Sequence, residues 1–290
     1  MINITELKKK KTIQELLEFG IINIDKSSGP TSFSVSEFVK NKLKLRKTSH
    51  FGTLDPKVTG VLPIALNRAC KLTGFFLGED KEYIGVMRIH EDVPVETIKK
   101  AIEEKFTGKI MQMPPVKSRV KREERQREIK RFEILEKNGK DFLFIAEVQG
   151  GTYIRKLISD LGDYMKIGAH MLELRRIRAG IFKEDSVINL YDFEKAVEEY
   201  ENGNEKPLRQ IIMPGEIVSQ VYKEVQIKEE VIVKIFQGKP IHKEDLKEKV
   251  EISKDKIISV FSGERFIGMF KVINTREIFA KSEFVLQPIR

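Results

Sequence analysis

Hydrophobic residues recur along this chain at two spacings, which together predict a mixture of strands and helices. Short apolar runs predict strands at 20–24, 83–90 and 142–148. Apolar residues three and four positions apart predict helices at 35–43, 98–106 and 154–165. Because strands and helices do not alternate regularly, the pattern indicates an α+β fold with a mixed, largely antiparallel sheet.

The predicted helices carry signals at their ends. Ser32 or Ser34 is expected to cap the first helix, and Gly108 is expected to end the second. Arg155 lies in the first turn of the third helix, away from its apolar stripe. A guanidinium beside a helix N-terminus favours an anion at that position.

A change in composition divides the chain. The segment 201–207 is polar and contains Gly and Pro, so we expect a linker there. Beyond it we predict a helix at 229–236 and strands at 257–261 and 266–273. The expected organisation is an arm at 1–20, a main domain at 21–205 and a small β-rich module at 211–290.

The expected arm is rich in lysine and has a short amphipathic stretch at Leu16, Leu17 and Phe19. It can dock on the body of the protein, bind RNA or remain a solvated tail. The residues alone leave these three alternatives open.

Net charge points to the class of partner. The chain has 53 Lys and Arg against 44 Asp and Glu in 290 residues, which gives +9 and favours a polyanion such as RNA or DNA. No apolar run reaches the ~18 residues of a transmembrane helix, and no signal peptide is evident. We therefore expect a cytoplasmic protein that does not contact a membrane.

Few residues of the chain suit metal or cofactor chemistry. The single cysteine, Cys70, excludes an internal disulfide and is expected to be structural. The histidines at 50, 90, 170 and 242 show no metal-ligand spacing in the sequence. Glycine-rich phosphate and dinucleotide loops are also missing from the sequence, so we expect neither a metal nor a cofactor.

Two segments concentrate basic residues. The segment 117–131 has eight Lys and Arg against three acidic residues, and it predicts either a phosphate-binding stripe or a solvated face with local ion pairs. In the segment 174–178, arginines alternate with apolar residues. These arginines can contact RNA or shield the core with their aliphatic stems.

Candidate chemistry centres on Asp55 in the segment 50–56, which reads His-Phe-Gly-Thr-Leu-Asp-Pro. Pro56 disfavours helical backbone at Asp55, while Gly52 and Gly60 permit sharp bends and close approach of a ligand. The pattern predicts a carboxylate presented outward from a rigid loop.

This segment and three others resemble the TruB and dyskerin family of pseudouridine synthases, over about 20–188. The other three are 24–32 (Ile-Asp-Lys-Ser-Ser-Gly-Pro-Thr-Ser), 81–83 (Lys-Glu-Tyr) and 151–155 (Gly-Thr-Tyr-Ile-Arg). Details after Pro115 and at 170–176 look more like the dyskerin branch, in its archaeal form. The chain departs from the family pattern at Ser27, Ser49 and Arg119.

The resemblance implies a fold, a reaction and partners. It implies a pseudouridine synthase catalytic domain at 21–205 and an RNA-binding PUA β-barrel at 211–290. The implied reaction isomerises uridine to pseudouridine without a cofactor, in the T-loop of tRNA or in rRNA. In the second case a box H/ACA guide RNA and the small H/ACA proteins are the implied partners.

The resemblance also assigns roles to single residues. Asp55 is implied to be the catalytic carboxylate and Arg155 its basic partner. Tyr83 is implied to stack on the target base, and His50 to act as a wedge or flipping aid. Lys26 is implied to support the active-site loop or to contact phosphate.

Two other functions fit part of the pattern. A non-catalytic RNA-binding scaffold explains the charge but leaves the aspartate, tyrosine and arginine unexplained. A nucleoside hydrolase uses a similar carboxylate and releases free uracil.

Overall fold

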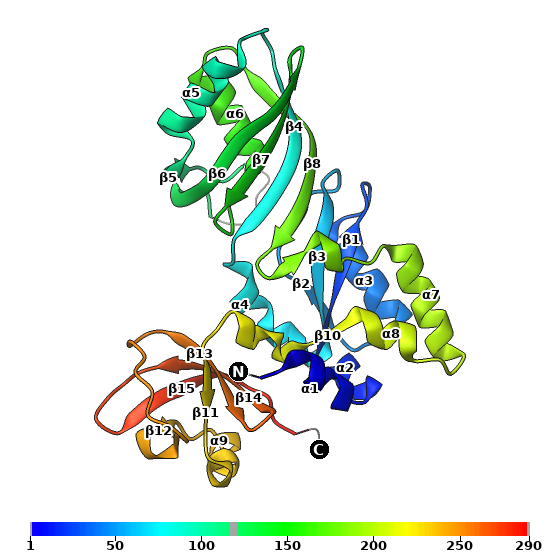
Figure 1. Ribbon diagram of the computed structural model, residues 1–290, viewed down its shortest axis with the longest axis vertical. Coiled ribbons are helices and arrows are strands. Elements are labelled where there is room, and N and C mark those ends of the chain that lie inside the picture. The colour runs from blue at the N-terminus through cyan, green and yellow to red at the C-terminus, as the bar shows by residue number, and fades with distance from the viewer. Residues whose placement is uncertain (1, 116–120, 289–290) are drawn as a thin grey trace.

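The computed structural model describes residues 2–115 and 121–288 and has two β-sheets (Figure 1). The larger sheet has ten strands within these residues, in the order β10-β1-β3-β8-β4-β7-β6-β5, with β2 paired to β3 and β9 to β8. Its strands are β1 (Gly20–Lys26), β2 (Thr48–His50), β3 (Thr59–Leu66), β4 (Lys81–Ile89), β5 (Gly108–Gln112), β6 (Arg125–Asn138), β7 (Asp141–Val148), β8 (Ala169–Ala179), β9 (Phe182–Lys183) and β10 (Ile212–Pro214). This mixed architecture confirms the expected α+β fold with a largely antiparallel sheet.

One short parallel ladder joins two halves of the large sheet. Strands β3 and β8 pair at Thr59 with Arg175 and at Gly60 with Arg176. The other named pairings of this sheet within the described residues are antiparallel. Figure 1 shows β4 to β8 in the upper half and β1, β3 and β10 in the lower half. The Asp55 loop leads into β3 and therefore lies at the junction of the halves.

Helices cover the sheets and connect their strands. Helix α6 packs against β8, α5 against β6, and α3 against β2. The helices are α1 (Ile4–Lys10), α2 (Ile13–Glu18), α3 (Ser32–Lys42), α4 (Thr73–Leu77), α5 (Val95–Lys105), α6 (Ile154–Tyr164), α7 (Leu190–Glu201), α8 (Lys206–Ile211) and α9 (Ile232–Phe236). The predicted helices at 35–43, 98–106 and 154–165 thus correspond to α3, α5 and α6.

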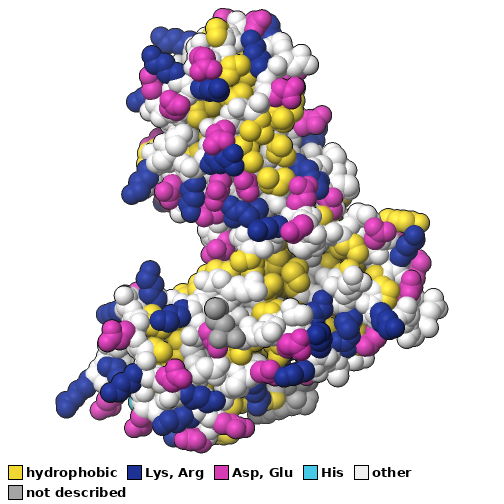
Figure 2. All heavy atoms as spheres, in the orientation of Figure 1, with side chains coloured by type: hydrophobic (Ala, Val, Ile, Leu, Met, Phe, Trp, Pro, Cys, Tyr) yellow, Lys and Arg dark blue, Asp and Glu magenta, His cyan; other side chains and the backbone are white. Residues whose placement is uncertain are grey.

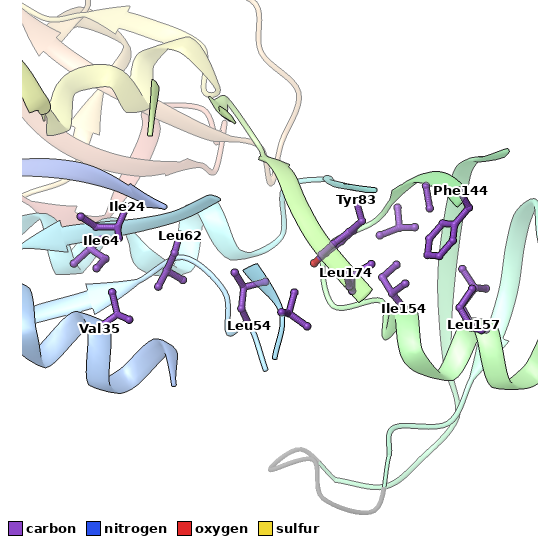
Figure 3. Packing of buried hydrophobic residues seen from close by; sticks show 14 of the residues in the cluster. Ile24, Val35, Leu54, Leu62, Ile64, Tyr83, Phe144, Ile154, Leu157 and Leu174 are labelled. Carbon is purple, nitrogen blue, oxygen red and sulfur yellow. The ribbon is translucent and has the colours of Figure 1, made fainter. Parts of the chain in front are cut away.

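A single apolar core continues beneath both halves of the large sheet (Figure 3). Ile24 and Leu62 contribute from the lower half, and Phe144 and Leu157 contribute from the upper half. Burial of this apolar surface stabilises the junction, where the parallel ladder alone is short. The core therefore fixes the two halves around the loop between them.

The cap of α3 differs from the expectation. Thr31 is the N-cap residue, and its side-chain oxygen accepts a hydrogen bond from the backbone N–H of Ser34 at 3.0 Å. Ser32 is the first helical residue and is buried. The sequence offered several hydroxyl side chains in a row, and local pattern did not distinguish the capping residue from the inward-facing one.

The smaller sheet has the order β11-β13-β14-β15-β12. Its strands are β11 (Glu224–Gln226), β12 (Ile241–His242), β13 (Ile257–Ser262), β14 (Arg265–Val272) and β15 (Ile278–Val285). The strands predicted at 257–261 and 266–273 are confirmed as β13 and β14. Phe19 stacks on Phe266 with ring centroids 5.5 Å apart, so a second apolar cluster joins this sheet to the N-terminal region.

The connection between the sheets lies further along the chain than the composition suggested. The segment 201–207, which we expected to be a linker, joins α7 to α8. Strand β10 follows and pairs with β1 of the large sheet. The first strand of the small sheet begins only at Glu224.

The N-terminal residues lie against the body of the protein. Lys10 pairs with Glu264 at 2.7 Å and Lys11 with Glu216 at 2.8 Å, while the backbone N–H of Ile2 donates to Glu224 at 2.7 Å. Of the three alternatives for the arm, these contacts match docking on the body.

Candidate active site

Asp55 and Arg155 meet at the junction of the two half-sheets. One guanidinium nitrogen of Arg155, Nη1, lies 3.3 Å from the carboxylate oxygen Oδ2 of Asp55. The two side chains are 53% and 52% exposed, so a substrate can reach both groups. Arg155 is in the first turn of α6, as the sequence predicted. The expected pairing is present, although it is a single contact rather than a two-point clamp.

Lys26 holds the Asp55 loop from beneath. Its ammonium group donates hydrogen bonds to three backbone carbonyls, those of Ser27 at 2.9 Å, Pro56 at 2.9 Å and Val58 at 2.8 Å. The residue is fully buried, and burial lowers its pKa while the Asp55 charge opposes that shift. This geometry agrees with the expectation that Lys26 supports the loop. Its side chain has no exposed surface that a phosphate could contact.

Ser32 fixes the residue before the catalytic candidate. Its hydroxyl accepts a hydrogen bond from the N–H of Leu54 at 2.8 Å and donates one to the carbonyl of Leu54 at 3.0 Å. The N–H of Gly29 donates to the carbonyl of Pro56 at 3.0 Å. The turn at 25–32 therefore supports the Asp55 loop through hydrogen bonds. These contacts give a structural reason why the segments 24–32 and 50–56 are both part of the pattern that resembles the family.

Arg176 holds the other side of the loop, and sequence reasoning did not single it out. The buried guanidinium donates to the carbonyl of Val61 at 2.8 Å and to that of Gly52 at 3.1 Å. At Gly60 a Cβ atom would lie 2.2 Å from the carbonyl oxygen of Arg176. Gly60 (φ +99°) and Gly52 (φ +111°) adopt left-handed backbone, so both expected bends are confirmed.

Tyr83 belongs to the apolar floor beside the ion pair. It is 8% exposed and lies on β4 opposite Arg176. In Figure 3 its hydroxyl points toward the space between Leu54 and Ile154. These two residues directly precede Asp55 and Arg155 and belong with Tyr83 to the same buried apolar cluster.

A cleft of about 410 Å³ opens at Arg155, within the range of about 300–1,000 Å³ common for small ligands. Its wall combines residues of the Asp55 loop with residues near the start of β8. The lining residues are Pro56, Lys57, Val58, Arg155, Met171, Leu172 and Leu174. Apolar walls with a few charged groups suit a flat, partly polar ring such as a nucleobase.

His50 ends β2 beside this arrangement. Its Nδ1 atom is buried and has no hydrogen-bond partner among the described residues. Burial, and secondly the Arg176 charge, lower the pKa of His50, which favours the neutral ring. The structure places His50 next to the loop without testing its expected role in base flipping.

Most of the basic residues described in the two segments pair with carboxylates, whereas Arg127 and Arg176 donate to backbone carbonyls. Arg175 contacts both oxygens of Asp25 at 2.9 Å, and Arg178 contacts Glu147 at 2.7 Å. Residues 116–120, with Arg119, lie outside the described residues. In the described remainder, Arg131 pairs with Glu133 at 2.6 Å, and Figure 2 shows acidic and basic side chains interspersed. Local ion pairs, rather than a continuous stripe, therefore characterise the described part.

The single cysteine has the environment of a structural residue. Burial raises the pKa of the Cys70 thiol to about 11, which matches that expectation.

The described residues include no helix long and apolar enough to span a membrane.

Comparison with known proteins decides the family. Residues 40–154 match the model of the TruB family pseudouridylate synthase N-terminal domain, and residues 155–219 match the tRNA pseudouridylate synthase B C-terminal domain. A "Probable tRNA pseudouridine synthase B" of Methanocaldococcus jannaschii is 40% identical over 273 residues, which are 93% of this chain and 81% of that protein. The chain belongs to the TruB family of pseudouridine synthases. It is thus an isomerase by family.

Other similar proteins agree with this assignment. A relative from Pyrococcus abyssi, also named "Probable tRNA pseudouridine synthase B", is 43% identical over 79% of this chain and 69% of its own length. A solved structure described as a Cbf5-Nop10-Gar1 complex matches 97% of this chain and 89% of its own with a TM-score of 0.90 and 35% identity. An H/ACA RNP bound to a substrate RNA containing 2'-deoxyuridine matches at 0.87 and 34%, over 97% and 89%.

Proposed function

We propose that this TruB-family chain converts RNA uridine to pseudouridine with Asp55 as the catalytic carboxylate. The half-exposed ion pair of Asp55 and Arg155, whose arginine lines the cleft, is the observation that carries the proposal. Arg155 orients the carboxylate from the N-terminus of α6. Tyr83 supplies an aromatic face for the uracil, and His50 assists its extrusion.

The reaction needs little beyond a carboxylate and a closed pocket. The bond from N1 of uracil to the sugar breaks, the base turns while it is held, and C5 forms the new bond to the same sugar carbon. N1 gains a proton and C5 loses one, so no oxidant, hydride or water is consumed. One ionised carboxylate therefore suffices, provided that the bound RNA closes the half-exposed site to water.

Two substrate classes follow from the relatives. The relatives named tRNA pseudouridine synthase B support a uridine of tRNA, which we place in the T-loop. The similar Cbf5-Nop10-Gar1 complex and H/ACA RNP support a reaction within an H/ACA particle with small protein partners, for which we propose rRNA uridines selected by a box H/ACA guide RNA. We further propose that this activity is cytoplasmic.

The proposal includes the organisation of the chain. An arm at 1–20 and a catalytic domain that begins at 21 precede a PUA domain that binds RNA. The sequence placed the start of the PUA domain at 211, but because β10 (Ile212–Pro214) pairs with β1, we propose that its sheet begins at Glu224. Support for the PUA domain comes from the compact five-stranded sheet β11 to β15 and from the net charge of the chain.

The decisive experiment compares wild type with Asp55→Asn in release of tritium from C5-labelled uridine. The substrates are a tRNA transcript alone, and an rRNA fragment with guide RNA and the small proteins. We expect the variant to lose at least about 10³-fold in rate while its RNA affinity stays nearly unchanged. Nuclease digestion of the product should yield pseudouridine.

Each other outcome has a distinct meaning. Release on tRNA without partners would establish intrinsic recognition, whereas release only with guide RNA would make the chain a particle subunit. Free uracil would indicate hydrolysis, and substantial activity of Asp55→Asn would refute the assigned role.

A further inference from the structure

Two histidines far apart in the sequence meet at the end of the upper half-sheet away from Asp55. His90 directly follows β4, and His170 is the second residue of β8. Their ring nitrogens, Nε2 of His90 and Nδ1 of His170, are 2.9 Å apart and share a hydrogen bond, so one of the two nitrogens carries the proton. Both side chains are exposed. Sequence spacing predicted no metal pair, because the ladder between β4 and β8 brings the two together across about 80 positions.

We propose that His90 and His170 bind a divalent transition-metal ion. Neutral imidazole nitrogen is a common ligand of Ni²⁺, Cu²⁺ and Zn²⁺. With metal–nitrogen bonds of about 2.0–2.1 Å, a nitrogen separation of 2.9 Å subtends about 90° at the metal. That angle matches two neighbouring ligands of a square-planar or tetragonal ion, so the geometry favours Cu²⁺ and Ni²⁺ over tetrahedral Zn²⁺.

The backbone around the pair is held in place. The N–H of His90 donates to the carbonyl of Gly168 at 3.1 Å, and the ammonium of Lys140 donates to the carbonyl of His90 at 2.7 Å. The rings are exposed and their planes lie 53° apart. A metal ion would replace the proton of the hydrogen bond between them, and both rings would turn to direct a lone pair at the ion. A rigid backbone with adjustable rings is the arrangement that a two-histidine site needs.

The charges near the pair permit a cation. Arg88, opposite His170 in the ladder, makes two hydrogen bonds to Asp141, at 2.6 and 2.7 Å. Its charge is therefore balanced by a carboxylate. No group of three or more His, Cys, Asp and Glu residues suited to a metal occurs in the described part of the chain. The ion would therefore have two protein ligands, and water would fill its other positions.

The test is titration of the full-length, chelator-treated protein with Cu²⁺ and Ni²⁺. We expect one equivalent to bind, and the electron paramagnetic resonance spectrum of the Cu²⁺ complex should show coupling to two nitrogens. His90→Ala and His170→Ala should each weaken binding at least tenfold and leave one coupled nitrogen. Because both residues are exposed, the variants should melt at nearly the wild-type temperature in the absence of metal.

His242→Asn is the matched control, since it removes a histidine from the small sheet and leaves an N-cap acceptor in place. It should bind Cu²⁺ as the wild type does. The proposal is overturned if the wild type shows no saturable binding. It is equally overturned if either single variant at the pair binds as well as wild type, or if His242→Asn loses as much affinity.

Discussion

Cations occur in two different settings around the Asp55 loop. Arg155 is half-exposed and faces a carboxylate, whereas Lys26, Arg176 and Lys81 are buried and face backbone carbonyls. Lys81, for example, donates to the carbonyls of Leu77 at 2.8 Å and Glu79 at 2.5 Å, just after α4. All four residues lie in or near the segments that resemble the family.

This difference in exposure distinguishes a cation that can act on a substrate from cations that only support the backbone. A charge that a substrate can reach can orient or stabilise a reacting group. A buried charge whose donors are all directed at carbonyls instead fixes the path of the backbone, at a cost in desolvation. A motif residue is therefore assigned a role by its exposure and partners, and not by its charge alone.

The largest effect that tests this comparison is on stability. Lys26→Met should lower the free energy of unfolding by about 3 kcal/mol, because three buried carbonyls lose their donor. Urea unfolding measures the change. The control Lys57→Met alters an exposed lysine of the same loop and should cost less than about 0.5 kcal/mol. Equal stability of the two variants would contradict the supporting role of Lys26.

The next largest effect is on the turnover rate, with little change in stability. Arg155→Lys should lower turnover about 10- to 100-fold. The lysine ammonium is not planar, so it cannot contact the Asp55 carboxylate and also present a flat guanidinium to the cleft. The free energy of unfolding should change by less than about 0.5 kcal/mol, since the pair is exposed.

The neighbouring variant Lys156→Arg provides the control for Arg155→Lys. Lys156 pairs with Asp160 within α6, so its exchange should leave turnover near the wild-type value. Single-turnover assays at saturating RNA separate rate from affinity. Wild-type turnover of Arg155→Lys would place Arg155 among the structural cations.

The smallest effect depends on pH. Burial lowers the pKa of Lys81 from 10.5 to about 8. Below pH 8 both the folded and unfolded states carry the proton. As pH rises toward 10.5, the folded state releases the proton first, so the unfolded state binds more protons and stability increases.

Relative to Lys81→Met, which cannot titrate, the wild type should gain about 1 kcal/mol between pH 8 and pH 9. Parallel urea titrations of the two proteins at these two values measure the gain. A constant difference would show that the Lys81 ammonium is better solvated than its burial indicates.

Much of the fold follows from local pattern. Helix α6 has a clear apolar stripe, and the apolar runs of β4 and β7 predicted strands, although the alternating burial of their side chains appears only in the structure. Strand β3 was not predicted, because Pro63 interrupts an apolar run that is buried almost throughout. Strand β8 was not predicted either, since its arginines obscure the alternation.

The candidate site was only partly predictable. Asp55 and Arg155 could be paired through the family resemblance, and the structure brings them together. Arg176 could not be assigned, because its carbonyl partners lie 115 and 124 positions earlier in the chain. Local sequence contains no record of such contacts, so a buried arginine there looks the same as a solvated one.

The short parallel ladder between β3 and β8 also has a consequence during synthesis of the protein. Asp55 leaves the ribosome early, but its partner from the other half, Arg155, is made 100 positions later, and Arg176, which holds the loop, is made 121 positions later. Closing so long a segment is slow relative to forming local helices and hairpins. The carboxylate therefore stays without its partner until most of the large sheet has been translated, and a nascent chain cannot modify RNA before that point.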